Sequence, residues 1–553
     1  MISNLQLENY KSFERANFEF PNLTFFVGPN SCGKSSVSNS LLMLTQSLDS
    51  SFNFETVLRL NGKNVGLGDE INIVRNYDKS KKVVISWSVE DDEKVFFELT
   101  TDRILDDFYH NFFSNHAHLR SVLKKDDKSS VLEKSNALQP EADLAYYGGY
   151  DGMKSSELVK VLKQQQSLVN KFLKNASLTE KQKNSFYRFT PARLSDLLEF
   201  IKNRDYTEMT PKSIKLQFRY NNNTNEIELE EHSILNKSGK EVLGFHFSTG
   251  KSIKIRSEII PQDLLDKSRF DIASKLHRNS ILLTKSHHSY RDVSTSQNPF
   301  SAYCLSYLQG ATEKLCEQLT KEKIYHVSPL RALPQRYYLL EKSANHKKIN
   351  SYSGTEVIEV LKNNPKVLEQ VNEFFSDFNI SILTVKVRDV IHKLTIKQDG
   401  LTVDLKDVGF GISQVLPILV QLFLCEEGST VIIEQPEIHL HPNMQAVLTS
   451  LLVKISLVQK KKLIIETHSE AMIRRLQLLY LDPKFDLNSS NVRFYQFTRN
   501  DDGTSEAHVD TFGLFGEIKW IKGFKDIEIQ DTLRIHELRV AKATRQTEGQ
   551  VDE

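Results

Sequence analysis

A glycine-rich segment near the N-terminus carries the strongest chemical signal in the chain. Residues 28–35, GPNSCGKS, match the pattern G-x-x-x-x-G-K-[S/T] at every position. The glycines of this pattern let backbone amides approach phosphates, Lys34 supplies a charge to the β- and γ-phosphates, and Ser35 offers a hydroxyl to Mg²⁺. The segment therefore predicts a nucleotide and Mg²⁺ site. The residues expected to contact the nucleotide are Asn30, Ser31, Cys32, Gly33, Lys34, Ser35 and Ser36.

The flanking residues supply the elements that such a loop needs. The apolar run at residues 23–27 predicts a buried strand, and the spacing of Val37, Leu41, Leu44 and Leu48 predicts a helix after the loop. A strand, a glycine-rich loop and a helix in that order distinguish a nucleotide site from a chance match. The N-terminus of the helix also favours an anion.

The second half of the site is expected about 400 residues downstream. Residues 431–437, VIIEQPE, form a β-branched run that ends in a carboxylate at Glu434. This pattern predicts a buried parallel strand with an acid at its C-terminal end, where ligands bind in open α/β sheets. Ser35 and Glu434 are therefore the predicted Mg²⁺ ligands.

A third strand is predicted at residues 462–465, and ETHS follows it at residues 466–469. His468, at a strand end, could sense a γ-phosphate. A histidine in this position, taken alone, more often has a structural hydrogen-bonding role. The P-loop and the acidic strand end earlier in the chain favour the functional interpretation.

A further glycine-containing segment, DVGFGISQ at residues 407–414, precedes an apolar helical stretch at 415–419. It predicts a second loop that approaches phosphate, although an ordinary turn before a helix has the same pattern. The residues expected to contact the nucleotide here are Gly409, Gly411, Ser413 and Gln414.

With these motifs the chain resembles the ABC-type ATPases of the RecF/SMC/OLD group. Within that group it looks most like the PtuA family, the ATPase subunits of Septu-type antiphage systems. The likeness covers roughly residues 1–100 and 320–525, and the middle of the chain is not covered. The stretches that carry it are residues 5–13, the P-loop, 58–62 with 67–68, 325–336, 408–419, 434–442 and 466–469.

The resemblance implies an α/β fold, an ABC-type ATPase head with a split P-loop core and a mixed α/β, largely helical insertion. It also implies a homodimer, or a higher oligomer, in which two heads enclose two ATP molecules. Lys34 of one head would then face the 409–414 segment of the other, and His468 would contact the γ-phosphate. The implied partners are an HNH nuclease subunit and, in some relatives, a retron reverse transcriptase with its msDNA.

Two positions depart from the family pattern. Gly409, followed by Phe410, stands where the family's signature usually has serine, and Ser413 is the candidate for the missing hydroxyl. Gln435 stands where many heads carry the glutamate that acts as general base. An amide orients water but does not accept its proton, so we expect ATP binding with slow or absent hydrolysis, and Glu437 is the substitute base to consider. The predicted catalytic residues are Gln435, Glu437 and His468.

Two histidine pairs invite a metal interpretation. His439 and His441 have the spacing of a metal pair, but no third or fourth ligand lies nearby in the sequence, and the run belongs to the family's strand-end loop. A structural role is therefore favoured. His287 and His288 are better explained as part of a solvated loop.

Composition sets wider limits. The 553 residues include 72 Lys and Arg against 71 Asp and Glu, a net charge of +1, so there is no global electrostatic case for nucleic acid. The four cysteines are scattered and lack metal spacing, which favours a reducing compartment. No signal peptide and no apolar run of about 18 residues is evident. We therefore expect a cytoplasmic protein.

The motifs predict four regions. They are an N-lobe with the P-loop at residues 1–105, an inserted domain at 106–320, a C-lobe at 321–515 and a partner-docking tail at 516–553. The tail carries Trp520 and a predicted helix at 527–543, which could dock a partner or pack on its own head. Strands are predicted at 83–89, 95–99, 213–220, 226–231 and 252–259, a long helix at 156–174, and a hairpin at 492–497 and 506–510.

The leading hypothesis is a regulatory ATPase that controls a separate nuclease effector in an antiphage complex, because the chain shows no nuclease motif of its own. The alternative is a DNA-repair ATPase of the RecF/SMC kind, which would show DNA-stimulated turnover. A stand-alone OLD-like nuclease is disfavoured, because no TOPRIM-like segment follows the second lobe.

Overall fold

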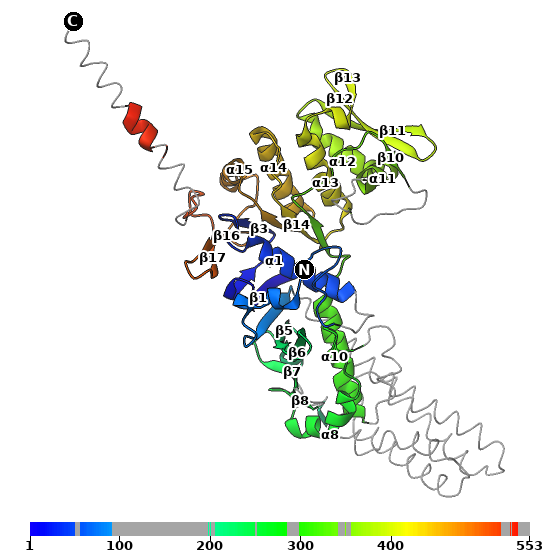
Figure 1. Ribbon diagram of the computed structural model, residues 1–553, viewed down its shortest axis with the longest axis vertical. Helices are drawn as coiled ribbons and strands as arrows, with labels where there is room; N and C mark the ends of the chain where they lie inside the picture. The colour runs from blue at the N-terminus through cyan, green and yellow to red at the C-terminus, as the bar shows by residue number, and fades with distance from the viewer. Residues whose placement is uncertain are drawn as a thin grey trace, which may run out of the picture. The chain divides into compact units, whose positions relative to one another are not determined.

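The computed structural model describes residues 1–49, 56–90, 197, 199–200, 205–248, 252–284, 298–340, 349, 355–520, 531 and 533–539 (Figure 1). The chain divides into two compact units. The first contains Met1–Gln46, Leu60–Val83 and Gln318–Glu553, and the second contains Ser47–Arg59 and Val84–Glu317. The four regional limits inferred from the motifs stay a prediction.

A six-stranded sheet forms the centre of the first unit, in the order β17-β16-β3-β15-β14-β9. All neighbours are parallel except β16 and β17, which form the expected antiparallel hairpin. Strand β3, near the N-terminus, thus lies in one sheet with strands more than 400 residues away, which confirms the predicted α/β fold with a split P-loop core. The strands are β3 (Leu23–Val27), β9 (Ile324–Val327), β14 (Thr430–Glu434), β15 (Lys462–Glu466), β16 (Val492–Arg499) and β17 (Ser505–Asp510).

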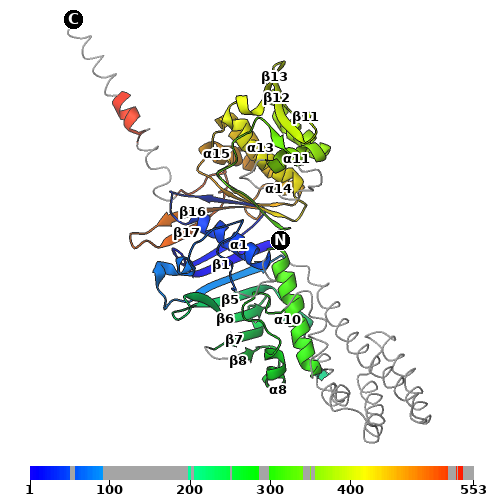
Figure 2. The ribbon, with the colours of Figure 1, turned by 45° about the vertical axis from the view of Figure 1, so that its right-hand side comes forward.

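Apolar side chains on both faces of this sheet require cover from both sides. Helices α13, α14 and α15 lie along one face and α1 lies along the other (Figures 1 and 2). Because alternate residues of a strand point to opposite faces, Phe25 joins the core with the first helix group, whereas Phe26 faces the other side. The helices are α1 (Lys34–Asp49), α13 (Phe410–Leu424), α14 (Pro442–Val458) and α15 (Glu470–Leu481).

A cluster of aromatic side chains packs on the face of the sheet that α1 covers. Strands β1 (Ile2–Tyr10) and β2 (Phe13–Glu19) form an antiparallel pair, and β2 carries the fully buried Phe18. The Phe18 ring lies 5.1 Å from Tyr495 and 6.0 Å from Phe497, measured between centroids. These contacts connect the first strands of the chain to one of its last.

A smaller α/β element is inserted between β9 and α13. Strands β10 (Tyr338–Leu339), β12 (Ile391–Gln398), β11 (Ile380–Arg388) and β13 (Leu401–Asp404) form an antiparallel sheet in which β12 pairs with each of the other three. Two helices with apolar faces, α11 (Thr355–Asn363) and α12 (Pro365–Ser376), contribute to the same core as the central sheet. Short 3₁₀ turns complete the unit at η1 (Glu70–Ile73), η2 (Arg75–Tyr77) and η3 (Leu405–Asp407).

The second unit contains an antiparallel meander with two longer helices. Strands β4 (Val83–Val89), β5 (Ser213–Asn221), β6 (Glu226–Leu235), β7 (Glu241–Phe247) and β8 (Ile253–Arg256) are neighbours in that order. Four of these strands were predicted, and β7 was not. The helices are α7 (Tyr206–Met209), α8 (Gln262–Ala273) and α10 (Pro299–Glu317). The predicted strand at 95–99, the predicted helix at 156–174 and the pair His287 and His288 lie outside the described residues.

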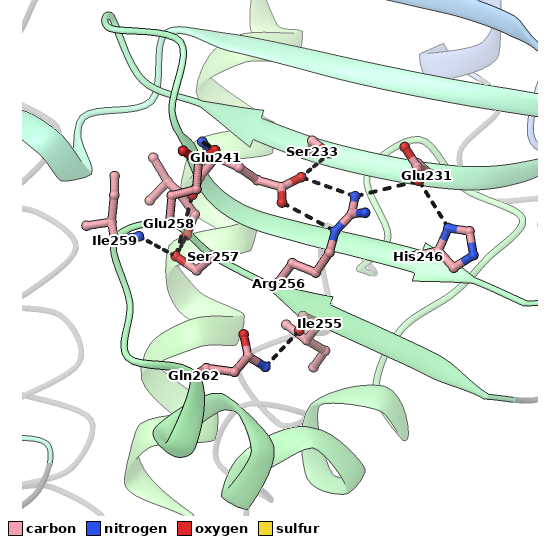
Figure 3. A network of polar contacts seen from close by, with 11 residues as sticks. Glu231, Ser233, Glu241, His246, Ile255, Arg256, Ser257, Glu258, Ile259 and Gln262 are labelled. Atoms are coloured by element: carbon pink, nitrogen blue, oxygen red, sulfur yellow. Dashed lines mark hydrogen bonds and ion pairs between the residues drawn. The ribbon is translucent and has the colours of Figure 1, made fainter.

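Cross-strand charge pairs line one part of this meander. Figure 3 shows Arg256 of β8 between Glu231 of β6 and Glu241 of β7, with Nη2 and Nε 3.6 and 3.4 Å from the respective carboxylates. His246 Nδ1 lies 3.1 Å from Glu231, and Ser233 donates to Glu241 over 2.6 Å. Arg256 and Glu241 lie on adjacent strands, whereas Arg256 reaches Glu231 across the intervening strand β7; opposite charges placed in this way stabilise a sheet surface.

The C-terminal segment begins against the first unit. Trp520 packs on the core of that unit, which favours the second of the two roles considered for the tail. Residues 531 and 533–539 are helical, in agreement with the predicted helix at 527–543. Among the described helices, none combines the length and the apolar character needed to span a membrane.

We expect Phe18→Ala to destabilise the first unit by about 3–5 kcal/mol, because it removes a buried aromatic ring that joins strands from both ends of the chain. Phe515→Ala is the control: that ring is 77% exposed and its loss should change stability by no more than about 0.5 kcal/mol. Urea unfolding followed by circular dichroism measures both. Equal midpoints for the two variants would contradict the assigned core.

Candidate nucleotide-binding site

Four strand ends meet at one edge of the central sheet. Strands β3, β15, β14 and β9 run parallel, so the segments that follow them leave the sheet at the same edge. These segments are the P-loop, residues 466–469, residues 434–437 and the segment that begins at Ser328. Glu434 and Glu466 are register partners on adjacent strands. The motifs predicted from distant parts of the sequence are thus brought together.

The P-loop has a backbone that only glycine accommodates at two positions. Gly28 and Gly33 have φ angles of 144° and 103°. A Cβ atom on Gly28 would lie 2.5 Å from the carbonyl oxygen of Phe497, too close for any side chain. Helix α1 begins at Lys34, whose Nζ donates to the carbonyl oxygens of Gly28 and Pro29 over 2.9 and 2.7 Å. The loop therefore curls around the lysine head, as a phosphate-binding loop requires.

Glu466 is a site residue that the sequence analysis did not select. The Ser35 hydroxyl donates to its Oε2 over 3.0 Å, and Lys34 Nζ lies 3.9 Å from its Oε1. Burial, followed by the charge of Glu434, raises the pKa of Glu466 to about 7, against the opposing effect of Lys34. The sequence signal that could have identified Glu466 was its position directly after the strand predicted at residues 462–465.

Glu434 lies where the prediction placed it, at the end of β14. Its Oε1 is 2.9 Å from Nε2 of His326 on β9, another residue that the sequence analysis missed. The hydroxyl of Ser35 and the carboxylates of Glu434 and Glu466 are hard oxygen donors of the kind that Mg²⁺ prefers. The donor set therefore fits a Mg²⁺ ion, which would neutralise the two adjacent acids.

Glu437 joins two strand-end loops. Its Oε1 accepts from the backbone N of His468 over 2.7 Å, and its Oε2 accepts from the Thr467 hydroxyl over 2.9 Å. Burial raises the pKa of Glu437. Gln435 has a φ of 45°, and its backbone N donates to the carbonyl oxygen of Glu466 over 2.7 Å. Three hydrogen bonds thus connect the loop after β14 to the end of β15 and the loop that follows it.

His468 has a buried ring nitrogen, Nε2, that forms no hydrogen bond within the part of the chain that the structure describes. Burial, followed by repulsion from Lys34, lowers the pKa of His468. The imidazole is therefore neutral near pH 7, with one nitrogen available to donate to an anionic oxygen. Together with Lys34, this residue fits a nucleotide phosphate.

The segment at 409–414 divides into an exposed and a buried part. Gly409 is exposed and precedes α13. Ser413 and Gln414 are both buried on α13. Gly411 lies close to the loop after β14 of the same chain, because a Cβ atom on it would lie 3.0 Å from the carbonyl oxygen of His439. That this segment contacts a second head stays a prediction. The exposed Gly409 would be available for such a contact.

Two histidines, His439 and His441, lie in the loop after β14 near the start of α14. His441 precedes α14, and its Nδ1 accepts from the backbone N of Asn443 over 3.3 Å. His439 is exposed and has a φ of 62°. Helix capping by His441 accounts for its place in the motif without a metal.

The P-loop, the adjacent acidic strand ends and the split parallel sheet define a P-loop ATPase core. Residues 1–473 match the family model described as AAA ATPase domain, and the chain belongs to that family.

No curated protein sequence matches the chain significantly. Among solved structures, it is similar to the SMC head domain from Thermotoga maritima, with 10% identity, a TM-score of 0.31, and coverage of 92% of this chain and 98% of that one. It is similar to an SMC head bound to the C-terminal winged-helix domain of ScpA, with 9% identity, a TM-score of 0.32 and coverage of 92% and 97%. A third is an SMC head with an extended coiled coil bound to the C-terminal domain of ScpA from Pyrococcus furiosus, with 10% identity, a TM-score of 0.32 and coverage of 96% and 99%.

Glu466 should make stability depend on pH. Its pKa rises from an ordinary 4.5 to about 7 on folding, so it binds its proton more tightly in the folded chain. It therefore favours the fold below pH 4.5, and this contribution is lost as the pH rises through 7. We expect the melting temperature without Mg²⁺ and nucleotide to fall from pH 5 to 8, and Glu466→Gln to reduce that fall. Glu470→Gln is the control, and an unchanged pH dependence in Glu466→Gln would contradict the assignment.

Proposed function

We propose that this chain binds ATP with Mg²⁺, hydrolyses it slowly and acts as a nucleotide-controlled switch. Lys34 and the P-loop amides would hold the phosphates. Ser35, Glu434 and Glu466 would hold Mg²⁺, which supplies charge neutralisation at the β- and γ-phosphates when bound. His468 would donate to the terminal phosphate through its buried ring nitrogen.

The state of the carboxylates supports slow hydrolysis. The residue after Glu434 is Gln435, whose amide cannot accept a proton from water at pH 7. Each nearby carboxylate already has partners. Glu466 accepts from Ser35, Glu434 contacts His326, and Glu437 accepts from the loop at 467–468. ATP that stays intact for long periods is suited to holding a conformation rather than to driving repeated cycles.

The likeness of the motifs to PtuA supports a particular use of this switch. We propose that two copies pair through ATP, with the exposed Gly409 segment of each facing the P-loop of the other. The paired heads would hold a separate HNH nuclease inactive, with or without a retron reverse transcriptase and msDNA, until infection disturbs the nucleotide state. In this proposal the protein is an ATP-binding regulatory subunit of a cytoplasmic antiphage complex.

Gln435→Glu should raise the rate of ATP hydrolysis by about 10²–10⁴-fold, the usual contribution of a general base, with little change in ATP affinity. Phosphate release under saturating ATP measures the rate. Lys34→Ala is the control for site-specific turnover and should abolish it in both backgrounds. An unaltered rate in Gln435→Glu would show that the missing base is not what limits hydrolysis.

Co-expression of the tagged protein with its neighbouring genes tests the proposed assembly. We expect a nuclease to co-purify in a fixed stoichiometry, with or without an RNA–DNA hybrid, and Lys34→Ala to disturb the complex. Mass spectrometry and nuclease-treated gels identify the components. A homodimer that instead retains DNA and shows DNA-stimulated hydrolysis would favour the repair-type ATPase and contradict the defence proposal.

A further inference from the structure

Three strand-end loops are joined by a group of four residues, which we call the clasp. It consists of Arg331 after β9, Glu437 after β14, and Thr467 and His468 after β15. Two of its hydrogen bonds connect Glu437 to the loop after β15, and a third, from Arg331, reaches the carbonyl oxygen of Glu434, the last residue of β14. The clasp lies directly beside the proposed nucleotide site.

Arg331 is the cation of the clasp. Its side chain is only 6% exposed, although the nearby Leu330 and Leu333 are 73% and 67% exposed. The turn is fixed by the Ser328 hydroxyl, which donates to the carbonyl oxygen of Leu330 over 2.7 Å. The segment after β9 therefore directs one charged side chain inward, towards the edge of the sheet where the site lies.

The hydrogen bonds of Arg331 go to the backbone at the end of β14. Its Nη2 donates to the carbonyl oxygens of Glu434 and Gln435 over 2.8 and 3.4 Å. Its Nε and Nη1 form no hydrogen bond with any residue in the described ranges. Burial lowers the pKa of Arg331 to about 10, while the negative charges of Glu437 and Glu434 oppose that shift, so the guanidinium remains charged at pH 7.

Glu437 is the anion of the clasp, and its geometry fits an orienting role better than that of a base. Both of its oxygens accept hydrogen bonds, one from the Thr467 hydroxyl and one from the backbone N of His468. Thr467 Oγ1 also accepts from the backbone N of Ser469, which caps α15. The backbone that carries His468 is thus held from both sides, while its Nε2 remains without a partner.

We propose that Glu437 is a positioning residue that holds His468 towards the terminal phosphate and so lets the protein distinguish ATP from ADP. This proposal rests on the proposed ATP site. It replaces the alternative in which Glu437 is the substitute general base. The two roles differ in what an amide can do at this position.

The test compares the affinities of ADP and a non-hydrolysable ATP analogue, with Mg²⁺, by calorimetry. Glu437→Ala leaves the His468 backbone without its acceptor, and we expect the preference for the ATP analogue to fall about 10-fold, the loss of one charge-assisted hydrogen bond. The ADP affinity should not change. Glu437→Gln can still accept from the His468 backbone and donate to Thr467, so it should keep the preference within about 3-fold of wild type.

Three further variants test whether the preference for the ATP analogue over ADP depends on His468 and not on a nearby acid outside the clasp. His468→Ala should reduce the preference about as much as Glu437→Ala, and the double variant should lose no more than His468→Ala alone, because both act through one contact. Glu470→Gln is the matched control. Its carboxylate lies in the first turn of α15, where it pairs with Arg474 over 3.1 Å, outside the clasp. It should bind both nucleotides as wild type does.

The role of Arg331 is tested by measuring both the melting temperature and the preference for the ATP analogue over ADP. Arg331→Met removes the hydrogen bonds to the carbonyl oxygens of Glu434 and Gln435 and the positive charge near the buried Glu437, and we expect a lower melting temperature and a reduced preference for the ATP analogue. Arg331→Met combined with Glu437→Gln removes both charges and should melt above Arg331→Met alone. Arg336→Met is the control, because Arg336 lies on the same segment but pairs at the surface with Asp407 over 2.9 Å.

Each outcome decides between the roles. An unchanged preference in Glu437→Ala, or equal losses of ADP and ATP affinity, would overturn the positioning role. Loss of hydrolysis in Glu437→Gln with the preference retained in Glu437→Ala would assign Glu437 as the base. Absence of any nucleotide binding by the wild-type protein would instead contradict the proposed function, and the two failures are therefore distinguishable.

Discussion

The parallel pairing of β15 with β3 on one side and β14 on the other is the constraint on which the site depends. It places the last residue of β15, Glu466, between the P-loop and Glu434. A shift of one residue in this register would turn Glu466 to the opposite face of the sheet and separate it from Ser35. Four of the five residues of β14 and all five of β15 are buried, so a shift would require side chains on both faces of the sheet to be repacked.

Three carboxylates lie close together at this edge of the sheet, and each has different partners. Glu466 has Lys34 and the Ser35 hydroxyl beside it, and its pKa is nevertheless raised by burial. Glu434 contacts His326 from the neighbouring strand. Glu437 is held by two donors of the loop after β15, near the buried Arg331. The ends of β14 and β15 thus contribute the acids, and the segments after β3 and β9 contribute the cations Lys34 and Arg331, so that a nucleotide with Mg²⁺ would enter a site whose charges are already ordered.

Much of this arrangement could be predicted from the sequence, because its elements have strong local signals. The P-loop was found from its glycine spacing. The strand before it, the strand ending at Glu434 and the strand before residues 466–469 were found from apolar runs, and the structure confirms these three as strands of one sheet. The residues that were missed act through tertiary contacts. Glu466 and His326 are recognisable only when the strand order is known, and Arg331 only when its burial between two exposed leucines is known. Strand β7 was missed because Gly244 and His246 interrupt its apolar pattern.

We predict that this edge of the sheet binds ATP and hydrolyses it only slowly. The most direct measurement is a single-turnover experiment in which excess protein is mixed with γ-labelled ATP and Mg²⁺, and bound ATP and released phosphate are followed over time. We predict Lys34-dependent binding with phosphate release far slower than the ~1 s⁻¹ at the lower end of typical enzymes. Release of all the label within seconds, or equal ATP binding by wild type and Lys34→Ala, would contradict the account.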